Sequence, residues 1–182
     1  ASTEISVISS GEDGFLIKWT DDNLGDHYQI SDMGIKMIAT SPNGTDIAIY
    51  ESDGGSVNKL SVYDWKTLKR KFFKRYADSI TSLNFSAKGK YLMIGTATVD
   101  GLEFRSTSNW QIVDKIKTNT SIVNYVQTSD TEKTCAMYSP AGSLAYYDLT
   151  NGKEKQKFKV AQGLSQVVLF NNSTFLAGVK DD

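Results

Sequence analysis

Six basic and three aromatic side chains stand close together between residues 66 and 76, with no acidic residue among them. The bases are Lys66, Lys69, Arg70, Lys71, Lys74 and Arg75. Basic groups pair with phosphates and aromatic rings stack on nucleobases, so this basic strip predicts contact with RNA or with an acidic protein surface. Lysines also discourage edge-to-edge pairing of an outermost strand. A second segment, 153–159, carries lysine at alternate positions, and this recurrence favours edge protection.

Residue types that commonly perform catalysis or bind metal ions are few. The only histidine is His27 and the only cysteine is Cys135. Two carboxylate pairs, Glu12-Asp13 and Asp21-Asp22, fall in turn-like segments, where acidic side chains commonly accept backbone hydrogen bonds. The sequence contains no Walker-type glycine loop, nucleophile elbow or His-Glu-x-x-His motif. We therefore expect a protein that is not an enzyme, with no catalytic residue, metal site or cofactor.

Length and composition are those of a folded protein with one sizeable core. The 182 residues include two prolines and 14 glycines, too few for a Pro/Gly-rich disordered chain. A single cysteine excludes a disulfide within the chain and favours a reducing compartment. No apolar run approaches the roughly 20 residues of a membrane helix. We expect an intracellular protein, of the cytoplasm or the nucleus, without membrane insertion.

Alternation of apolar and polar residues with a period of two runs from end to end, and it predicts β-strands throughout. The expected strands are 4–9, 15–20, 25–30, 35–41, 46–51, 59–64, 69–76, 79–86, 90–97, 102–106, 110–117, 122–128, 134–139, 143–148, 154–160, 164–170 and 174–179. Connections such as Pro-Asn-Gly, Val-Asp-Gly and Pro-Ala-Gly supply residues that accept positive φ or preset a turn. The chain is therefore expected to be all-β and rich in hairpins.

A short motif recurs about every 42 residues. Its clearest copy is Gly-Glu-Asp-Gly-Phe-Leu-Ile-Lys-Trp at 11–19, where an Asp-Gly turn leads into a strand that ends on an aromatic residue. The strand-ending positions are interpreted as Trp19, Tyr63, Ser106 and Tyr147. Repetition at this period is typical of β-propeller blades, whereas a β-sandwich does not need a fixed four-strand period.

These residues resemble the WD40 repeat family. Segment 9–20 follows the family's blade signature, and Tyr63-Asp64 and Tyr147-Asp148 are similar to its strand-ending Trp-Asp. The family's Gly-His dipeptide before the innermost strand appears nowhere, so its buried His–Ser/Thr–Asp–Trp network cannot be complete in any repeat of this chain. The resemblance implies a divergent β-propeller of WD40-like four-stranded antiparallel blades.

The strand order of that family implies that the propeller is incomplete, with three full blades and two partial ones. Residues 1–182 then belong to a single propeller domain with a partial blade at 1–30, full blades at about 35–76, 79–117 and 122–160, and a partial blade at 164–182. Both ends would leave open sheet edges, which isolated proteins avoid. We expect another segment or another chain to supply the remaining blades, because self-association would not supply the missing strands.

Alternating apolar residues, including Trp19, Leu92 and Val168, are interpreted as packing between neighbouring blades. The resemblance also places the loops into the innermost strands, and those between second and third strands, on one rim. The longest is at 52–58, and loops on a rigid scaffold are where binding usually occurs. The acidic partner-binding candidates on these loops are Asp32, Asp53, Asp78 and Asp100.

Charge is divided unevenly along the chain. Residues 1–55 carry ten acids and two lysines, whereas the rest carries 18 bases and 11 acids. Successive repeats occupy successive sectors of a propeller, so an acidic sector would lie beside a basic one. We interpret the chain as a non-catalytic protein–protein interaction scaffold in a multisubunit complex, presenting rim loops and charged sectors to other protein subunits. The alternative is an RNA-associated factor that contacts nucleic acid through the basic strip.

Overall fold

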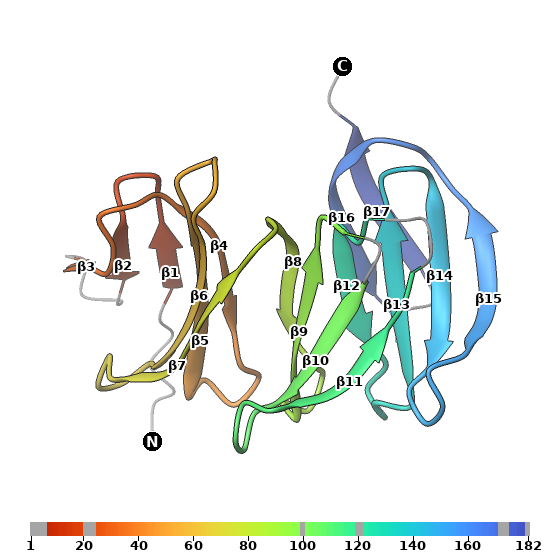
Figure 1. Cartoon of the computed structure of the whole chain (residues 1–182), viewed down its shortest axis with the longest axis horizontal. Coiled ribbons are helices and arrows are strands. Elements are labelled where there is room, and N and C mark those ends of the chain that lie inside the picture. Colours follow the sequence, from red (N-terminus) through yellow and green to blue (C-terminus); the bar gives the residue numbers. More distant parts are fainter. Residues whose placement is uncertain (1–6, 20–24, 99–100, 119–121, 171–174, 181–182) are drawn as a thin grey trace.

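The computed structural model describes residues 7–19, 25–98, 101–118, 122–170 and 175–180. Within these residues the chain forms seventeen β-strands and no helix (Figure 1). The strands pair antiparallel with their sequence neighbours in five separate sheets. Hairpin-connected strands can pair only in this way, because a tight turn reverses the chain direction. The predicted all-β class is confirmed.

Each sheet takes a consecutive set of strands. The first sheet holds β1 (Val7–Ser10), β2 (Phe15–Trp19) and β3 (Asp26–Gln29). The second sheet holds β4 (Ile35–Thr40), β5 (Asp46–Ser52), β6 (Asn58–Asp64) and β7 (Arg70–Tyr76). The third sheet holds β8 (Ile80–Phe85), β9 (Tyr91–Thr96), β10 (Leu102–Ser106) and β11 (Ile112–Ile116). The fourth sheet holds β12 (Tyr125–Thr128), β13 (Thr134–Ser139), β14 (Ser143–Asp148) and β15 (Glu154–Lys159). The fifth sheet holds β16 (Leu164–Phe170) and β17 (Phe175–Lys180).

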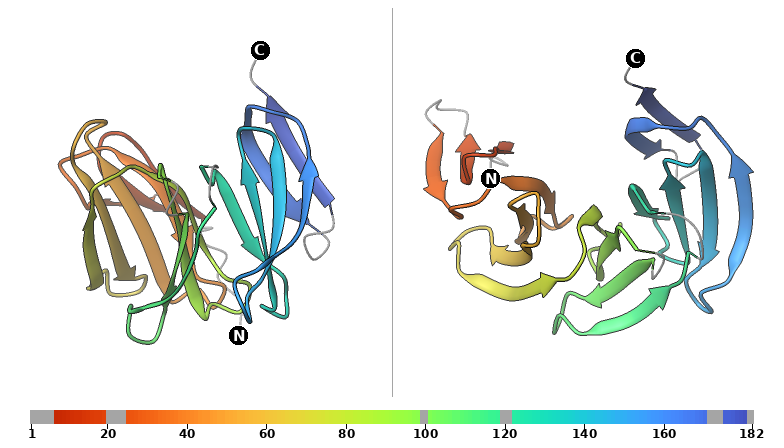
Figure 2. Two further views of the ribbon diagram at one scale, coloured as in Figure 1. Left: turned by 45° about the vertical axis from the view of Figure 1, so that its right-hand side comes forward. Right: turned by 45° about the horizontal axis from the view of Figure 1, so that its top comes forward.

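The five sheets are arranged as the blades of a propeller. Figure 2 shows them following one another along an open arc, with the first and fifth sheets at its two ends. The first strands of neighbouring sheets touch, since β4 contacts β8, β8 contacts β12, and β12 contacts β16. These strands are therefore innermost. Three four-stranded sheets between a three-stranded and a two-stranded sheet confirm the expected fold of three full and two partial blades.

Apolar side chains are buried between the sheets. On β9, Leu92 and Ile94 pack against the second sheet, where they meet Leu60. Met93, between them in sequence, points the other way and packs against Val126 of the fourth sheet. Successive side chains of a strand face opposite sides. A blade covered on both faces therefore needs apolar residues at consecutive positions, and this explains the run Tyr-Leu-Met-Ile in β9.

Polar side chains join the innermost strands of the third and fourth sheets. The Thr81 hydroxyl donates to the Val123 carbonyl at 2.6 Å, and the Asn84 amide donates to the Val126 carbonyl at 3.1 Å. These bonds satisfy carbonyls that face a neighbouring blade instead of a paired strand. They therefore fix the offset between two sheets that share no backbone ladder.

The register corrects one position of the predicted repeat. Tyr63 and Tyr147 occupy the same place in their sheets, opposite the second residue of the preceding strand, and Arg105 takes that place in the third sheet. Ser106, which was expected there, begins the following turn and accepts a hydrogen bond from the Trp110 N–H at 2.8 Å. Ser106 ends β10 as expected, but the residue equivalent to Tyr63 and Tyr147 is Arg105, one position earlier.

Candidate interaction surfaces

The basic strip covers the turn between β6 and β7 and the whole of β7, the outermost strand of the second sheet. Because alternate residues of a strand face opposite sides, the six bases do not form one surface. Lys71 and Lys74 are engaged in ion pairs with carboxylates of the chain. Lys71 is nevertheless exposed, as are the other four bases, Lys66, Lys69, Arg70 and Arg75.

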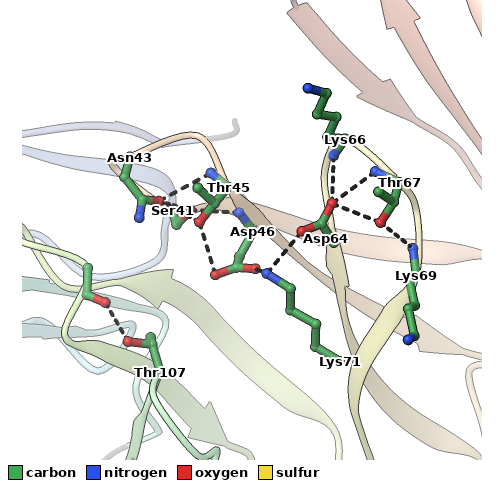
Figure 3. Close-up of polar contacts among 11 residues, drawn as sticks. Ser41, Asn43, Thr45, Asp46, Asp64, Lys66, Thr67, Lys69, Lys71 and Thr107 are labelled. Carbon is green, nitrogen blue, oxygen red and sulfur yellow. Dashed lines mark hydrogen bonds and ion pairs between the residues drawn. The ribbon is translucent and has the colours of Figure 1, made fainter.

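Lys71 bridges two carboxylates at one end of the second sheet (Figure 3). Its ammonium donates to Asp46 Oδ1 at 2.5 Å and lies 3.2 Å from Asp64 Oδ2. Asp46 and Asp64 are directly opposite each other on β5 and β6, where like charges repel. The hydrogen bond to Asp46 raises the pKa of Lys71. The charge of this lysine is therefore already matched within the sheet.

Asp64 shapes the turn that leads into β7. Its Oδ1 accepts the N–H groups of Lys66 at 3.2 Å and Thr67 at 2.9 Å, and also the Thr67 hydroxyl at 2.9 Å (Figure 3). Asp148 repeats this arrangement with the N–H and hydroxyl of Thr150. These bonds lower the pKa of both carboxyls to about 2. The aspartate of each Tyr-Asp pair therefore forms a turn.

Asp64 and Asp148 predict a specific loss of stability in acid. Their folded pKa of about 2 lies below the ordinary value of 3.8, so each stabilises the fold above about pH 4. That contribution disappears as the pH falls from about 4 to about 2. The double variant Asp64→Asn/Asp148→Asn keeps the turn acceptors but does not titrate. We expect its melting temperature, followed by circular dichroism, to fall less over this range than that of the wild type; equal slopes would contradict the assignment.

Lys74 and Tyr76 reach from β7 into a buried polar network on the third sheet. The Glu103 carboxylate accepts hydrogen bonds from Tyr76 at 2.7 Å and from Arg105 Nε at 2.5 Å, and it lies 3.5 Å from the Lys74 ammonium. Arg105 also donates to the Trp110 carbonyl at 2.7 Å. The side chains of Glu103 and Arg105 are only 8% and 7% exposed. The network therefore joins the second and third sheets.

The Glu103 carboxylate is the acceptor of ion pairs from Arg105, Lys74 and, at 3.8 Å, Lys115. Burial raises the pKa of Glu103, but the Tyr76 hydrogen bond and the charges of Arg105 and Lys74 outweigh burial and leave this pKa below its ordinary value. Burial lowers the pKa of Lys74, which Glu103 opposes. The Arg105 guanidinium also lies over the Phe72 ring, 4.9 Å from its centre. The side of β7 that faces the third sheet thus packs against it.

Sequence reasoning did not single out Glu103 and Arg105. Both stand on β10, an interior strand of a sheet whose two faces are covered by neighbouring sheets. A charged side chain at such a place must be paired, because burial of an unpaired charge is very costly. Opposite charges two positions apart on an interior strand, as in Leu-Glu-Phe-Arg, are therefore the signal that could have predicted the pair.

The residues of the basic strip that do not face the third sheet form an exposed surface. The Arg70 guanidinium lies 5.0 Å from the centre of the Phe73 ring, and Phe73 is 42% exposed. Lys66 lines an open groove of about 540 Å³, which also contacts Lys18 and Trp65. The Lys18 ammonium lies 5.2 Å from the centre of the Trp65 ring. This end of the first two sheets is therefore basic and partly aromatic.

Three turns of the first two sheets meet at the other end of the strands. The Ser31 N–H donates to the Gly14 carbonyl at 3.3 Å, and the Ser52 N–H donates to the Gly34 carbonyl at 3.1 Å. The turn before β2, the connection before β4 and the turn before β6 are thereby held side by side. Their exposed acidic residues, which we call the acidic rim, are Glu12, Asp13, Asp32 and Asp53; the Glu12 carboxylate forms an ion pair with Lys36 at 2.5 Å.

The turn between β5 and β6 is ordered by its own side chains. Asp53 Oδ1 accepts the N–H of Gly55 at 2.8 Å and that of Val57 at 3.1 Å, and these bonds lower the pKa of Asp53. The Ser52 hydroxyl accepts the Gly54 N–H at 3.1 Å. Residues 53–56 of this turn are exposed, yet the N–H groups of Asp53, Gly54, Gly55 and Val57 are bonded within the turn. It is therefore a preformed protrusion at the acidic rim.

The other residues singled out from the sequence are placed as follows. Asp78 is exposed between β7 and β8, at the same end of the strands as the acidic rim. Asp100 and the pair Asp21-Asp22 lie outside the described residues. Cys135 is fully buried, and burial raises the pKa of its thiol.

Neither a metal cluster nor a membrane-spanning helix occurs in the part of the chain that the structure describes. No three His, Cys, Asp or Glu side chains there are grouped to hold a metal ion. No helix among those residues has the length and apolar character to cross a membrane.

The whole chain, residues 1–182, matches the family described as an N-terminal beta-propeller domain. The chain belongs to this family. A protein of Treponema pallidum (strain Nichols), described as an uncharacterized protein, is 29% identical over 182 residues. This match covers 100% of the chain and 30% of the Treponema protein, so the propeller chain spans less than a third of its relative's length.

Proposed function

We propose that this β-propeller chain is a protein–protein interaction scaffold that presents its acidic rim to a basic surface of a partner protein. The observation that carries the proposal is that four exposed carboxylates stand on three turns that hydrogen bonds hold together. A preformed surface loses little conformational entropy on binding. A patch of net negative charge also speeds encounter with a basic surface.

The scaffold is proposed as a divergent relative of the WD40 repeats, acting without bond chemistry in an intracellular multisubunit complex. Support comes from Tyr63-Asp64 and Tyr147-Asp148, which end the third strand of their blades, with the aspartate forming the turn into the outermost strand. The Trp-Asp pair takes the same place in the WD40 repeats that this chain resembles. Its partners are proposed to be other protein subunits of that complex.

Removing the charge of the acidic rim tests the proposal. The quadruple variant Glu12→Gln/Asp13→Asn/Asp32→Asn/Asp53→Asn keeps the amide oxygens that the turns need as acceptors. We expect the full-length protein with these changes to recover its partners about tenfold less well. Each exposed charge pair contributes a few tenths of a kcal/mol, and the loss of several pairs together approaches the roughly 1.4 kcal/mol of a tenfold change in affinity. The measurement is affinity capture from native cells after nuclease treatment, quantified by mass spectrometry.

A charge-removal variant at the opposite end of the strands is the matched control. Lys66→Gln/Lys69→Gln/Arg70→Gln changes exposed bases and leaves the buried pairs intact. Both variants should melt within a few degrees of the wild type. Partners lost with the acidic-rim variant and kept with the control support the proposal. Recovery of the same partners with both would overturn it.

RNA binding is the second candidate function, because Lys66, Lys69 and Arg70 are exposed beside the exposed ring of Phe73. Lys71 is not part of this surface, since Asp46 and Asp64 hold it. In this case partners would disappear with nuclease, and single-stranded RNA would bind with steep salt dependence that the control variant reduces. Absent or salt-insensitive RNA binding excludes this function.

A further inference from the structure

Each full sheet has one face that is closed by the sheet following it. On the second strands β5, β9 and β13, the residues Ala48, Met93 and Ala136 stand at the same register position. They are 0%, 0% and 1% exposed, and each packs in a cluster with residues of the following sheet. We call the side of each sheet that carries these residues its forward face. The forward faces of the second, third and fourth sheets are therefore all covered.

The forward face of the fifth sheet is exposed. Ala177 on β17 takes the position of Ala136, opposite Val168, and it is exposed. Val168 and Val179 on the same face are each 56% exposed. On the other face, Leu164 and Val167 of β16 pack on the fourth sheet at 6% and 8% exposure, whereas Gly178 and Lys180 of β17 are exposed. Val168 was expected to pack between blades, and in the described part of the chain it lacks its cover.

Residues at the equivalent position of Val179 in two complete interfaces are buried. Tyr50 and Tyr138 stand at the register position of Val179, and they are 3% and 0% exposed. Tyr138 packs on the fifth sheet, and its hydroxyl accepts the Leu164 N–H at 3.0 Å. A branched apolar side chain at this place gains stability when a following sheet covers it.

The first sheet also has an exposed face, on the side opposite to that of the fifth sheet. Val7 takes the position of Ile47, and Trp19 takes that of Tyr63, on the face that points away from the second sheet. Ile47 and Tyr63 are 0% and 9% exposed, whereas Val7 and Trp19 are 59% and 41% exposed. Both ends of the arc in Figure 2 therefore present faces that are buried at every internal interface.

A second copy of the same chain fits the exposed face poorly. Every interface among the second to fifth sheets includes contact between innermost strands. In the first sheet, β1 occupies the register of a second strand, because Val7 lies opposite Trp19 as Ile47 lies opposite Tyr63. Among the described residues, docking that sheet on the fifth gives β16 no innermost strand to contact. A complete four-stranded blade has no such gap.

We propose that the forward face of the fifth sheet binds one further antiparallel blade of the same polypeptide. This blade would place large aliphatic residues against Val168, Ala177 and Val179, as Leu92 and Ile94 of the third sheet do against the second. The source follows from chain length: the match covers 30% of the Treponema relative, and the family is described as an N-terminal domain. The inference goes beyond the scaffold proposal and does not depend on the acidic rim.

Thiol reactivity in the full-length protein tests the cover directly. Val179→Cys places a thiol on the forward face, and Val113→Cys places one on β11, where Val113 is 52% exposed. Cys135 is fully buried and contributes little background. We expect the thiol at 179 to react with a maleimide at least about tenfold more slowly than that at 113 in the native protein, and equally fast in denaturant.

Equal native rates at the two sites would overturn the proposal. Slow labelling at 179 that becomes fast on dilution, together with a dimer-to-monomer transition in light scattering, would also overturn it, because the cover would then be a second copy. Slow labelling that is independent of concentration supports it. If the Val179→Cys variant does not fold, hydrogen exchange of the unaltered protein decides: the β17 amides that are hydrogen-bonded to β16 should be as protected as the β13 amides bonded to β12, and fast exchange there would overturn the proposal.

Discussion

Replacing Gly14 with alanine is expected to lower the free energy of unfolding by about 3 kcal/mol. Gly14 has a φ of +77°, and a Cβ there would lie 2.0 Å from the Ser31 carbonyl oxygen. Positive φ costs an alanine about 1–2 kcal/mol, and forcing the chains apart adds about 1–3 kcal/mol. Gly101 repeats the arrangement, with φ +82° and a Cβ position 2.0 Å from the Ile116 oxygen. The measurement is urea denaturation followed by tryptophan fluorescence.

Gly54 provides the matched control for Gly14→Ala. Its φ is +78°, yet no described atom lies within 4 Å of its Cβ position. Gly54→Ala should therefore cost only the backbone strain, about 1 kcal/mol. Equal costs for the two variants would show that the close approach to the outer strand does not matter. The difference between them measures how tightly the turn before β2 packs against the segment that follows β3.

Removing the buried carboxylate between the second and third sheets is expected to have a similarly large effect. Glu103→Leu leaves the Arg105 guanidinium buried without a counter-charge at Nε, with the Trp110 carbonyl at 2.7 Å and the Tyr76 hydroxyl at 3.4 Å as neutral acceptors. Breaking a buried ion pair from one side typically costs about 3 kcal/mol, because the other charge stays in a poorly hydrated place. Thermal and urea unfolding of the full-length protein measure this cost.

The double variant Glu103→Leu/Arg105→Met separates charge from shape. Both groups become apolar and keep roughly their volume, so most of the stability should return, to within about 1 kcal/mol of the wild type. If the double variant is as unstable as Glu103→Leu, then shape and the Tyr76 hydrogen bond stabilise this interface, and the ion pair does not. Such a result would reject the interpretation of the network as a matched charge pair.

The strands were predictable because period-two alternation is a local property of the chain. All seventeen expected strands are present, with bounds mostly within two residues of the prediction. The turn glycines were also predictable from the sequence, although only one of the two reasons why glycine is needed at Gly14 and Gly101 was predictable. Positive φ could be expected from Asp-Gly sequences, whereas the close approach to a carbonyl of the fourth strand is a contact across the blade.

The basic strip shows what a local sequence pattern cannot predict. Its six bases are alike in sequence, but Lys71 and Lys74 are held by carboxylates while Lys66 and Lys69 face solvent. The partner of Tyr76 is Glu103, 27 residues further along the chain on another sheet. No periodicity within the strip encodes that distance. A basic segment could therefore be recognised, but its free and paired charges could not be told apart.

Local patterns in the chain predict an all-β protein of repeated four-stranded blades, because alternation, turn residues and a fixed period each act within about 42 neighbouring residues. The folded arrangement is needed to know which charged groups are paired, that Asp32 and Asp53 lie at one rim, and that Val168 and Val179 are exposed at the end of the arc. Burial and ion pairing depend on distances between sheets. Those distances arise only when side chains far apart in sequence pack together.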